Sequence, residues 1–102
     1  SPFEDDDGLS YIYQPEVISA NNIKIFPNPA TDQISINIKS EAESQRFNVR
    51  FYNNTGVLVY QSVKEDNATI SLKNLGFKPG IYFVRIETND IAETLKIVLV
   101  QE

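Results

Sequence analysis

The clearest two-residue alternation in the chain lies in residues 81–86. Tyr82, Val84 and Ile86 point to one face of an extended segment, and the residues between them point to the other. Because both sets are largely apolar, we predict a central strand with a core on one face and partial cover on the other. Pro79-Gly80 stands just before this strand, and its residue types suit the two central positions of a type II turn.

Six further segments carry shorter versions of an extended pattern. Ile34, Ile36 and Ile38 alternate with polar residues, which is typical of a half-buried strand with one solvated face. The Asn-rich sequence at 53–56 ends in glycine and separates two such segments, which predicts a β-hairpin. No window shows the helical spacing of apolar residues. Besides 81–86, the predicted strands are 23–26, 34–38, 47–52, 57–60, 69–72 and 92–100.

This pattern predicts an all-β fold, an immunoglobulin-like antiparallel β-sandwich of about seven short strands, over residues 21–102. Residues 1–20 contain the acidic run Glu4-Asp5-Asp6-Asp7 and no sustained period. We expect them to be a linker or N-terminal arm that leads in from a preceding domain. A short strand or extended arm packed on the domain is the alternative. Because the chain begins with Ser1, we expect it to be a piece of a longer protein.

Pro27-Asn28-Pro29 ends the first strand of the predicted sandwich. Neither proline has a backbone N–H to donate to a ladder, so this segment is expected at an edge or corner and not within a central strand. One interpretation is a turn that starts the sandwich. The functional alternative is an exposed corner that a partner recognises.

Composition narrows the classes of function. The net charge is −5 and the nine Lys and Arg residues are dispersed, which argues against a nucleic-acid partner. Because the chain has no His and no Cys, it lacks the residues of the Ser-His-Asp and Cys-His nucleophile systems and of imidazole or thiolate zinc sites. The remaining carboxylates fall mostly in predicted loops and turns, where water solvates them. We therefore predict no enzyme, no cofactor and no small-molecule substrate.

Calcium binds carboxylate oxygens, so we compared the acidic run around Gly8 with the calcium-binding loop of an EF-hand. If Gly8 were the sixth position of an EF-hand loop, Phe3 would occupy the first ligand position. Gln14 would replace the bidentate glutamate at the twelfth. Because the match fails at both ends, we interpret the run as a solvated acidic linker and expect no metal site.

Three landmarks together resemble a known family. They are the sequence IFPNPATD at 25–32 with the isoleucine strand after it, GVLVY at 56–60, and LGFKPGIYFVRI at 75–86 followed by KIVLV at 96–100. Their order and spacing are similar to the type A C-terminal sorting domain of proteins exported by the bacterial type IX secretion system. The resemblance covers about residues 21–102.

The resemblance implies a domain that addresses its own protein for export. In that family an immunoglobulin-like sandwich follows a cargo domain, which crosses the inner membrane by its own signal peptide. The sorting domain then directs the cargo from the periplasm of a Gram-negative bacterium through the outer membrane. A sortase-like peptidase at the cell surface usually removes the domain, and the cargo stays attached to the surface or is released. The implied partners are the outer-membrane machinery and that peptidase, with the cut before about Asn21.

The sequence offers a surface for such recognition. Phe83, Val98 and Val100 lie on the nominally outer faces of strands whose other faces fill the core, and an exposed apolar strip marks a docking site. An end strand with free backbone groups also accepts strand addition. In the alternative interpretation the N-terminal arm or a second sheet covers this strip. The predicted recognition residues are Pro27, Asn28, Pro29, Gly80, Tyr82, Phe83, Val84, Lys96, Ile97, Val98, Leu99 and Val100.

A second function class remains open from the sequence. A cell-surface binding or spacer module of the immunoglobulin or fibronectin kind has the same fold and grips carbohydrate or protein. Such modules usually rely on exposed aromatic residues. Here there is no Trp, and apart from Tyr11 and Tyr13 the tyrosines fall within predicted strands.

Overall fold

Strands account for the regular structure in the computed structural model, which describes residues 17–18, 23–38, 46–65, 67–89 and 91–101. The predicted strands at 23–26, 34–38, 47–52, 69–72, 81–86 and 92–100 are all present within a residue or two of their expected bounds. Their bounds are β1 Val17–Ile18, β2 Ile23–Phe26, β3 Gln33–Ile38, β4 Arg46–Asn53, β5 Leu58–Glu65, β6 Ala68–Ser71, β7 Gly80–Glu87 and β8 Ala92–Leu99.

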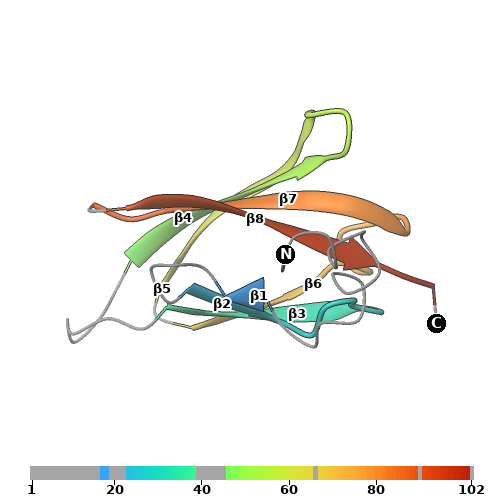
Figure 1. Cartoon of the computed structure of the whole chain (residues 1–102), viewed down its shortest axis with the longest axis horizontal. Helices are drawn as coiled ribbons and strands as arrows, with labels where there is room; N and C mark the ends of the chain where they lie inside the picture. The colour runs from blue at the N-terminus through green and yellow to red at the C-terminus, as the bar shows by residue number, and fades with distance from the viewer. Residues whose placement is uncertain (1–16, 19–22, 39–45, 66, 90, 102) are drawn as a thin grey trace, which may run out of the picture.

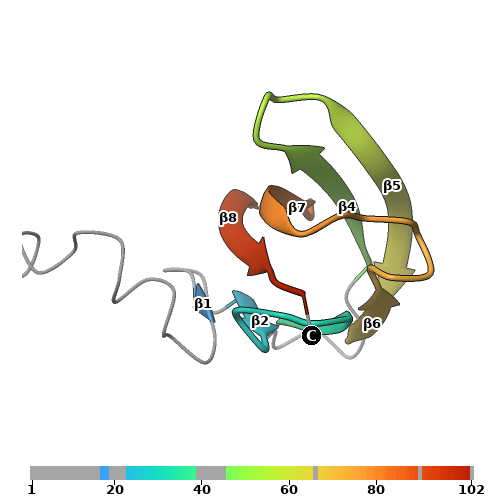
Figure 2. The ribbon, with the colours of Figure 1, turned by 90° about the vertical axis from the view of Figure 1, so that its right-hand side faces the viewer.

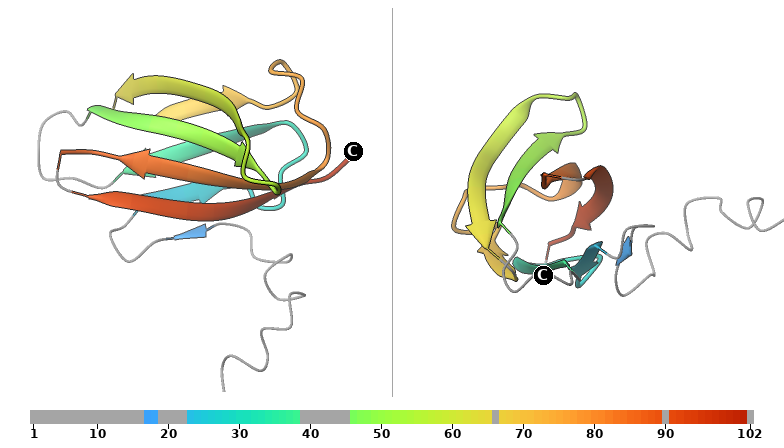
Figure 3. Two further views of the ribbon diagram at one scale, coloured as in Figure 1. Left: turned by 90° about the horizontal axis from the view of Figure 1, so that it is seen from above. Right: turned by 90° about the vertical axis from the view of Figure 1, so that its left-hand side faces the viewer.

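The strands form two antiparallel sheets that face each other (Figure 1). The first sheet has the order β1-β2-β3-β6 and the second has the order β5-β4-β7-β8. Figure 3, left, shows the second sheet from above with its four strands side by side. This order differs from the constant-type immunoglobulin sandwich mainly in β5, which pairs with β4 and not with the first sheet. The predicted all-β immunoglobulin-like sandwich is confirmed.

The core lies between the inner faces of the two sheets. On β7, Tyr82, Val84 and Ile86 are buried, while the residues that alternate with them are half-buried, as the sequence pattern predicted. Full burial of a side chain such as Val84 contributes about 1.5–3 kcal/mol to folding. The other buried apolar residues are Ile23, Ile25, Ala30, Ile34, Ile36, Phe47, Val49, Phe51, Ile70, Leu72, Leu95, Ile97 and Leu99.

Tyr82 has a second structural role at the start of β7. Its hydroxyl donates a hydrogen bond to the backbone carbonyl of Lys78, four residues upstream, at 2.5 Å. Its ring stacks on Phe77 with centroids 4.8 Å apart. A tyrosine that bonds back to the segment before the same strand is the tyrosine corner of immunoglobulin-like sandwiches. Tyr82 therefore fixes how the connection after β6 enters the second sheet.

The β4–β5 hairpin forms where the sequence predicted it. Gly56 adopts a φ of +87°, and its N–H donates to the carbonyl of Asn53 at 2.9 Å. The side-chain oxygen of Asn53 accepts from the N–H groups of Thr55 and Val57, both at 3.0 Å. The tip of this hairpin projects away from the first sheet (Figure 1). Consequently Val57 has few neighbours and is 56% exposed.

Two local predictions differ from the structure. Gly80 has a positive φ of 154°, far from the value near 80° that a type II turn requires, so the turn predicted at Pro79-Gly80 is wrong. Gly80 is instead the first residue of β7 and pairs with Leu99. The return strand predicted at 57–60 continues to Glu65. Val17 and Ile18 form β1 beside β2, whereas 1–16, with the acidic run, lies outside the described residues, as does 39–45.

The two sides of the sandwich differ in which strands end the sheets. On one side β2 and β8 approach each other, and β1 also comes close to β8. On the opposite side lie β5 and β6, each the last strand of its own sheet (Figure 2). One candidate surface described below includes the end of β8, and the other lies between β5 and β6.

Candidate functional site

The Pro27–Ala30 corner is hydrogen-bonded to the last strand. The N–H of Ala30 donates to the carbonyl of Val98, and the N–H of Val100 donates to the carbonyl of Ala30, both at 2.8 Å. Ala30 and Leu99 thereby form a short parallel bridge between the two sheets. We call this arrangement, residues 27–30 with residues 98–100, the clip.

Asn28 supplies the third hydrogen bond of the clip. Its side-chain oxygen Oδ1 accepts from the N–H of Val98 at 2.9 Å, and the residue is 1% exposed. The flanking prolines have no N–H to donate, and the hydrogen bonds from this corner to the last strand are made by Asn28 and Ala30. The amide nitrogen Nδ2 of Asn28 has no hydrogen-bond partner. A buried unpaired donor is costly, so the stabilising contribution of the Asn28 side chain comes from the hydrogen bond that its oxygen accepts.

The clip brings together two of the predicted recognition segments, 27–29 and 96–100. It also corrects the expectation that the final strand offers free backbone groups along its edge. At Val98 and Val100 those groups are already bonded to Asn28 and Ala30. Strand addition at this end of β8 would therefore require the clip to open.

The predicted recognition residues fall into three classes of exposure. Asn28, Tyr82, Val84, Ile97 and Leu99 are buried, so in the folded domain they act through the fold. Pro27 and Gly80 are exposed. The half-buried members are Pro29, Phe83, Lys96, Val98 and Val100.

Half-buried apolar side chains form a row on the outer face of the second sheet. Ile81 on β7 pairs with Val98 on β8, and Phe83 follows two residues after Ile81 on the same face. Tyr52 on β4 pairs with Phe83 from the other side. The sequence pattern placed Ile81 on this face but did not select it, and Tyr52 joins the row only through the pairing of β4 with β7.

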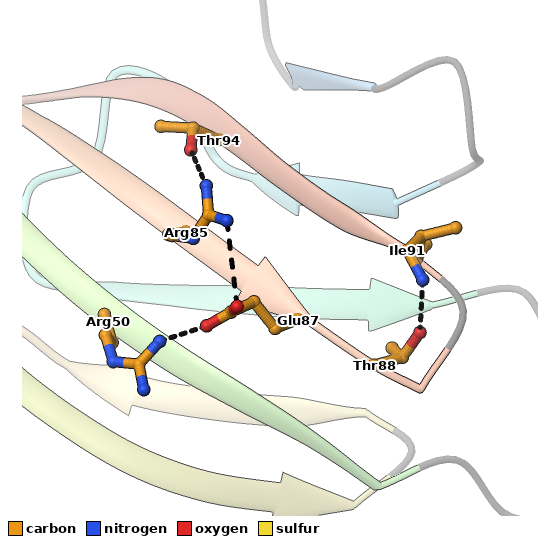
Figure 4. A network of polar contacts seen from close by, with 6 residues as sticks. All are labelled: Arg50, Arg85, Glu87, Thr88, Ile91 and Thr94. Atoms are coloured by element: carbon orange, nitrogen blue, oxygen red, sulfur yellow. Dashed lines mark hydrogen bonds and ion pairs between the residues drawn. The ribbon is translucent and has the colours of Figure 1, made fainter.

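Charged residues continue this face beyond the apolar row (Figure 4). A guanidinium nitrogen of Arg50 contacts Glu87 Oε1, and Arg85 lies 3.7 Å from Glu87 Oε2. Arg85 also donates to the hydroxyl of Thr94 at 3.4 Å. Two arginines therefore share one carboxylate. Lys96 lies on the same face, opposite Phe83, so Arg50, Arg85 and Lys96 outnumber Glu87 and this part of the face carries a net positive charge.

A hollow of about 500 Å³ lies where the chain leaves β8. It is bounded by the clip, the connection before β7 and the end of the last strand. Phe77 and Pro79 provide apolar walls, and Lys73 provides a positive charge at its rim. Its lining residues are Thr31, Lys73, Phe77, Pro79, Leu99, Val100 and Gln101.

Two of the described acidic residues make hydrogen bonds or ion pairs at separate places in the fold. Asp32 accepts a hydrogen bond from the hydroxyl of Ser71 at 2.8 Å, and Glu65 lies 3.7 Å from Arg46. Among the residues that the structure describes, no three acidic or other metal-ligating side chains gather as a metal site would require. That part of the chain also contains no helix of the length and hydropathy needed to span a membrane.

Comparison with known proteins gives a family match and a relative. The model of the family described as the secretion system C-terminal sorting domain matches residues 24–101. An endo-acting ulvan lyase from Formosa agariphila is 31% identical over 70 residues. The aligned segment is 68% of this chain and 13% of the lyase, so the chain spans a small part of that relative's length.

Proposed function

We propose that this chain directs the export of a cargo protein joined to its N-terminal side. It belongs to the secretion system C-terminal sorting domain family of the type IX pathway. The cargo passes from the periplasm through the outer membrane to the cell surface or the medium of a Gram-negative bacterium. The domain contributes a folded surface that the outer-membrane machinery reads. The family is a sorting-signal family and not a catalytic one.

The observation that carries this proposal is the clip. The family match begins in β2, shortly before the Pro27–Ala30 corner, and ends just after β8. The clip joins these ends through Asn28 and Val98, which are 70 residues apart in the chain. A signal built in this way is complete only when the whole domain has folded. This supports recognition of a folded domain over recognition of a linear peptide.

The surface we propose for docking consists of Ile81, Phe83 and Val98 of the outer apolar row together with Val100, which follows Val98 two residues later, just after the last strand. These side chains are half-buried, and Lys96 adds a positive charge at their border. Partly exposed apolar area next to a positive charge suits a protein partner with an apolar patch and acidic residues. The buried predicted residues, such as Val84 and Ile97, hold this row in place.

We further propose that a sortase-like surface peptidase removes the domain by cutting the linker before about Asn21. The domain is then the substrate of the cleavage and contributes none of its chemistry. The comparison with the lyase supports a preceding cargo domain, because a segment similar to this chain makes up only 13% of that larger protein.

Export of a reporter tests the proposal. Residues 1–102 are fused behind a periplasmically directed fluorescent protein in a bacterium that has this secretion route. We expect surface fluorescence for the unmodified domain. Val98→Asp with Val100→Asp places two carboxylates in the apolar row while leaving the inward-facing core residues of β8 unchanged. We expect this variant to keep its circular dichroism spectrum and to accumulate in the periplasm.

A matched control uses the start of β8 and the turn before it. Asn89→Asp with Ala92→Asp adds the same charge at exposed positions, and we expect normal export. Normal export of a folded Val98→Asp, Val100→Asp domain would refute the docking surface. Periplasmic retention of the unmodified, folded fusion would refute the sorting function and favour a cell-surface binding module.

A further inference from the structure

The side of the sandwich opposite the clip has an open edge. β5 pairs with β4 and ends the second sheet, so its backbone groups on the other side have no strand partner in the described part of the chain. β6 ends the first sheet in the same way. A long edge strand with unpaired N–H and C=O groups is a template for another extended chain.

A shallow groove of about 210 Å³ runs between these two edges. Tyr60 and Lys64 enter it from the inner face of β5, and Leu75, which is 39% exposed, also lines it. Tyr60 also packs against the core, with its ring 5.8 Å from that of Phe51. The remaining lining residues, from β6 and the turn after it, are Thr69, Ile70, Ser71 and Asn74.

β5 carries more exposed apolar side chains than any other described strand. Val57, just before it, is 56% exposed, and Val63 is 54% exposed. Leu58 and Val59 are 45% and 40% exposed, and the pairing with β4 skips Val59 through a bulge. Apolar side chains gathered along an unpaired edge mark an interaction site more strongly than scattered ones.

Lys64 provides the charge that selects a partner. It lies opposite the buried Phe47 in the pairing of β4 with β5, so its side chain points to the groove side of the strand. Lys64 takes part in no ion pair in the structurally described part of the chain. An acidic side chain that enters the groove would complement it.

We propose that the β5 edge binds an extended segment of a partner protein by antiparallel strand addition. The added strand places an acidic residue opposite Lys64 and, four residues later, an apolar residue opposite Tyr60 and Leu75. In the direction of the partner's chain, the pattern is acidic, any, polar, any, apolar. Backbone bonds to the edge supply affinity and these two side chains supply selectivity. The inference stands whether or not this partner belongs to the export machinery.

A second copy of the chain does not satisfy this site. If β5 paired with β5 of another molecule, inward-facing residues would lie opposite inward-facing residues. The acid on β5 is Glu65, which points to the outer face and lies 3.7 Å from Arg46. No register of β5 with itself therefore places a carboxylate opposite Lys64, and the charge favours an unlike partner.

A peptide titration followed by nuclear magnetic resonance tests this proposal on the full chain. The probe is an acetylated, amidated heptapeptide, Thr-Thr-Glu-Val-Ser-Thr-Leu. We expect saturable shifts in the backbone amides of 58–65 and 69–75, with those of 92–100 unmoved. In Lys64→Glu the affinity should fall about tenfold or more, and a heptapeptide with lysine in place of glutamate should restore it.

The controls separate this site from simpler explanations. Lys78→Glu makes the same charge change at an exposed position outside the groove, and its affinity for the heptapeptide should equal that of the unmodified chain. If Lys64 serves only to protect the edge from aggregation, Lys64→Glu will leave the affinity unchanged and the proposal fails. It also fails if about 1 mM peptide produces no saturable shifts, or if the same amides shift with protein concentration alone.

Discussion

The two sides of the sandwich end their sheets in different ways. On the β2–β8 side, Asn28 and Ala30 bond to the last strand and close the gap between the sheets. On the β5–β6 side, neither edge strand has a further partner in the described residues, and a groove lies between them. One fold thus has a side sealed by its own chain and a side left open.

The comparison shows that a few residues determine whether the backbone groups at a sheet edge are paired within the chain or left open. The sealed side uses two prolines, which have no N–H to offer, and one buried asparagine that supplies an acceptor. The open side has a bulge at Val59 and an inward-facing lysine at position 64, and neither of them closes the edge. Both sides belong to strands with ordinary alternation, so the distinction lies in a few side chains.

The largest expected difference in the free energy of unfolding is between truncations of one strand residue on each side. Ile97→Ala on β8 removes a fully buried side chain and should lower the free energy of unfolding by about 2–5 kcal/mol. Val63→Ala on β5 changes a side chain that is 54% exposed and should stay within about 0.5 kcal/mol of the unmodified domain. Urea unfolding followed by circular dichroism measures both. Equal losses would contradict the contrast.

The next contrast concerns the clip itself. Asn28→Ala leaves the N–H of Val98 without its acceptor and should cost about 1–3 kcal/mol. Part of this cost is offset because the unpaired Nδ2 disappears as well. Asn67→Ala, at an exposed position before β6, is the matched control and should be nearly neutral. A neutral Asn28→Ala in the same urea assay would mean that the clip does not stabilise the domain.

A smaller effect is expected at the hairpin of the open side. Gly56→Ala forces a residue with a Cβ into a φ of +87° and should cost about 1–2 kcal/mol. No atom lies within 4 Å of the added Cβ, so the cost is conformational and not steric. Gly56→Asn should cost less, since asparagine tolerates this region better. Thermal unfolding that ranks asparagine below alanine would be inconsistent with this explanation.

The smallest effect is expected on the outer face of the second sheet, away from both sides. Glu87→Gln breaks the contacts with Arg50 and Arg85 and should cost less than about 1 kcal/mol. The cost should shrink as salt is added. Glu65→Gln, whose pair with Arg46 is largely exposed, should have no measurable effect at any salt concentration. A large, salt-independent loss for Glu87→Gln would indicate a different role for this carboxylate.

Local patterns predicted most of the fold. The alternation at Tyr82, Val84 and Ile86 identified the central strand and its buried face. The pattern failed to extend β5 beyond Tyr60, because residues 61–65 are mostly polar on both faces of an edge strand. It also misassigned Gly80, since glycine without a Cβ can adopt both the φ near 80° of a type II turn and the φ of 154° found at the start of β7.

The candidate sites depended on contacts that local sequence does not encode. The segment 27–29 was selected for its two prolines and the end of the last strand for its apolar outer face, but the hydrogen bond between Asn28 and Val98 joins residues 70 apart and is not visible in either local pattern. The exposure of Phe83 and the burial of Tyr82 follow from alternation. The groove beside Lys64 does not, because it depends on which strands end the two sheets.

Amide hydrogen exchange tests the contrast between the two sides most directly. We expect the N–H groups of Val98 and Val100 to exchange only when large parts of the domain unfold, because Asn28 and Ala30 accept hydrogen bonds from them. The N–H groups of β5 that point away from β4 should exchange almost as fast as in an unfolded chain. Rapid exchange at Val98 and Val100, or slow exchange at every amide of β5, would contradict this expectation.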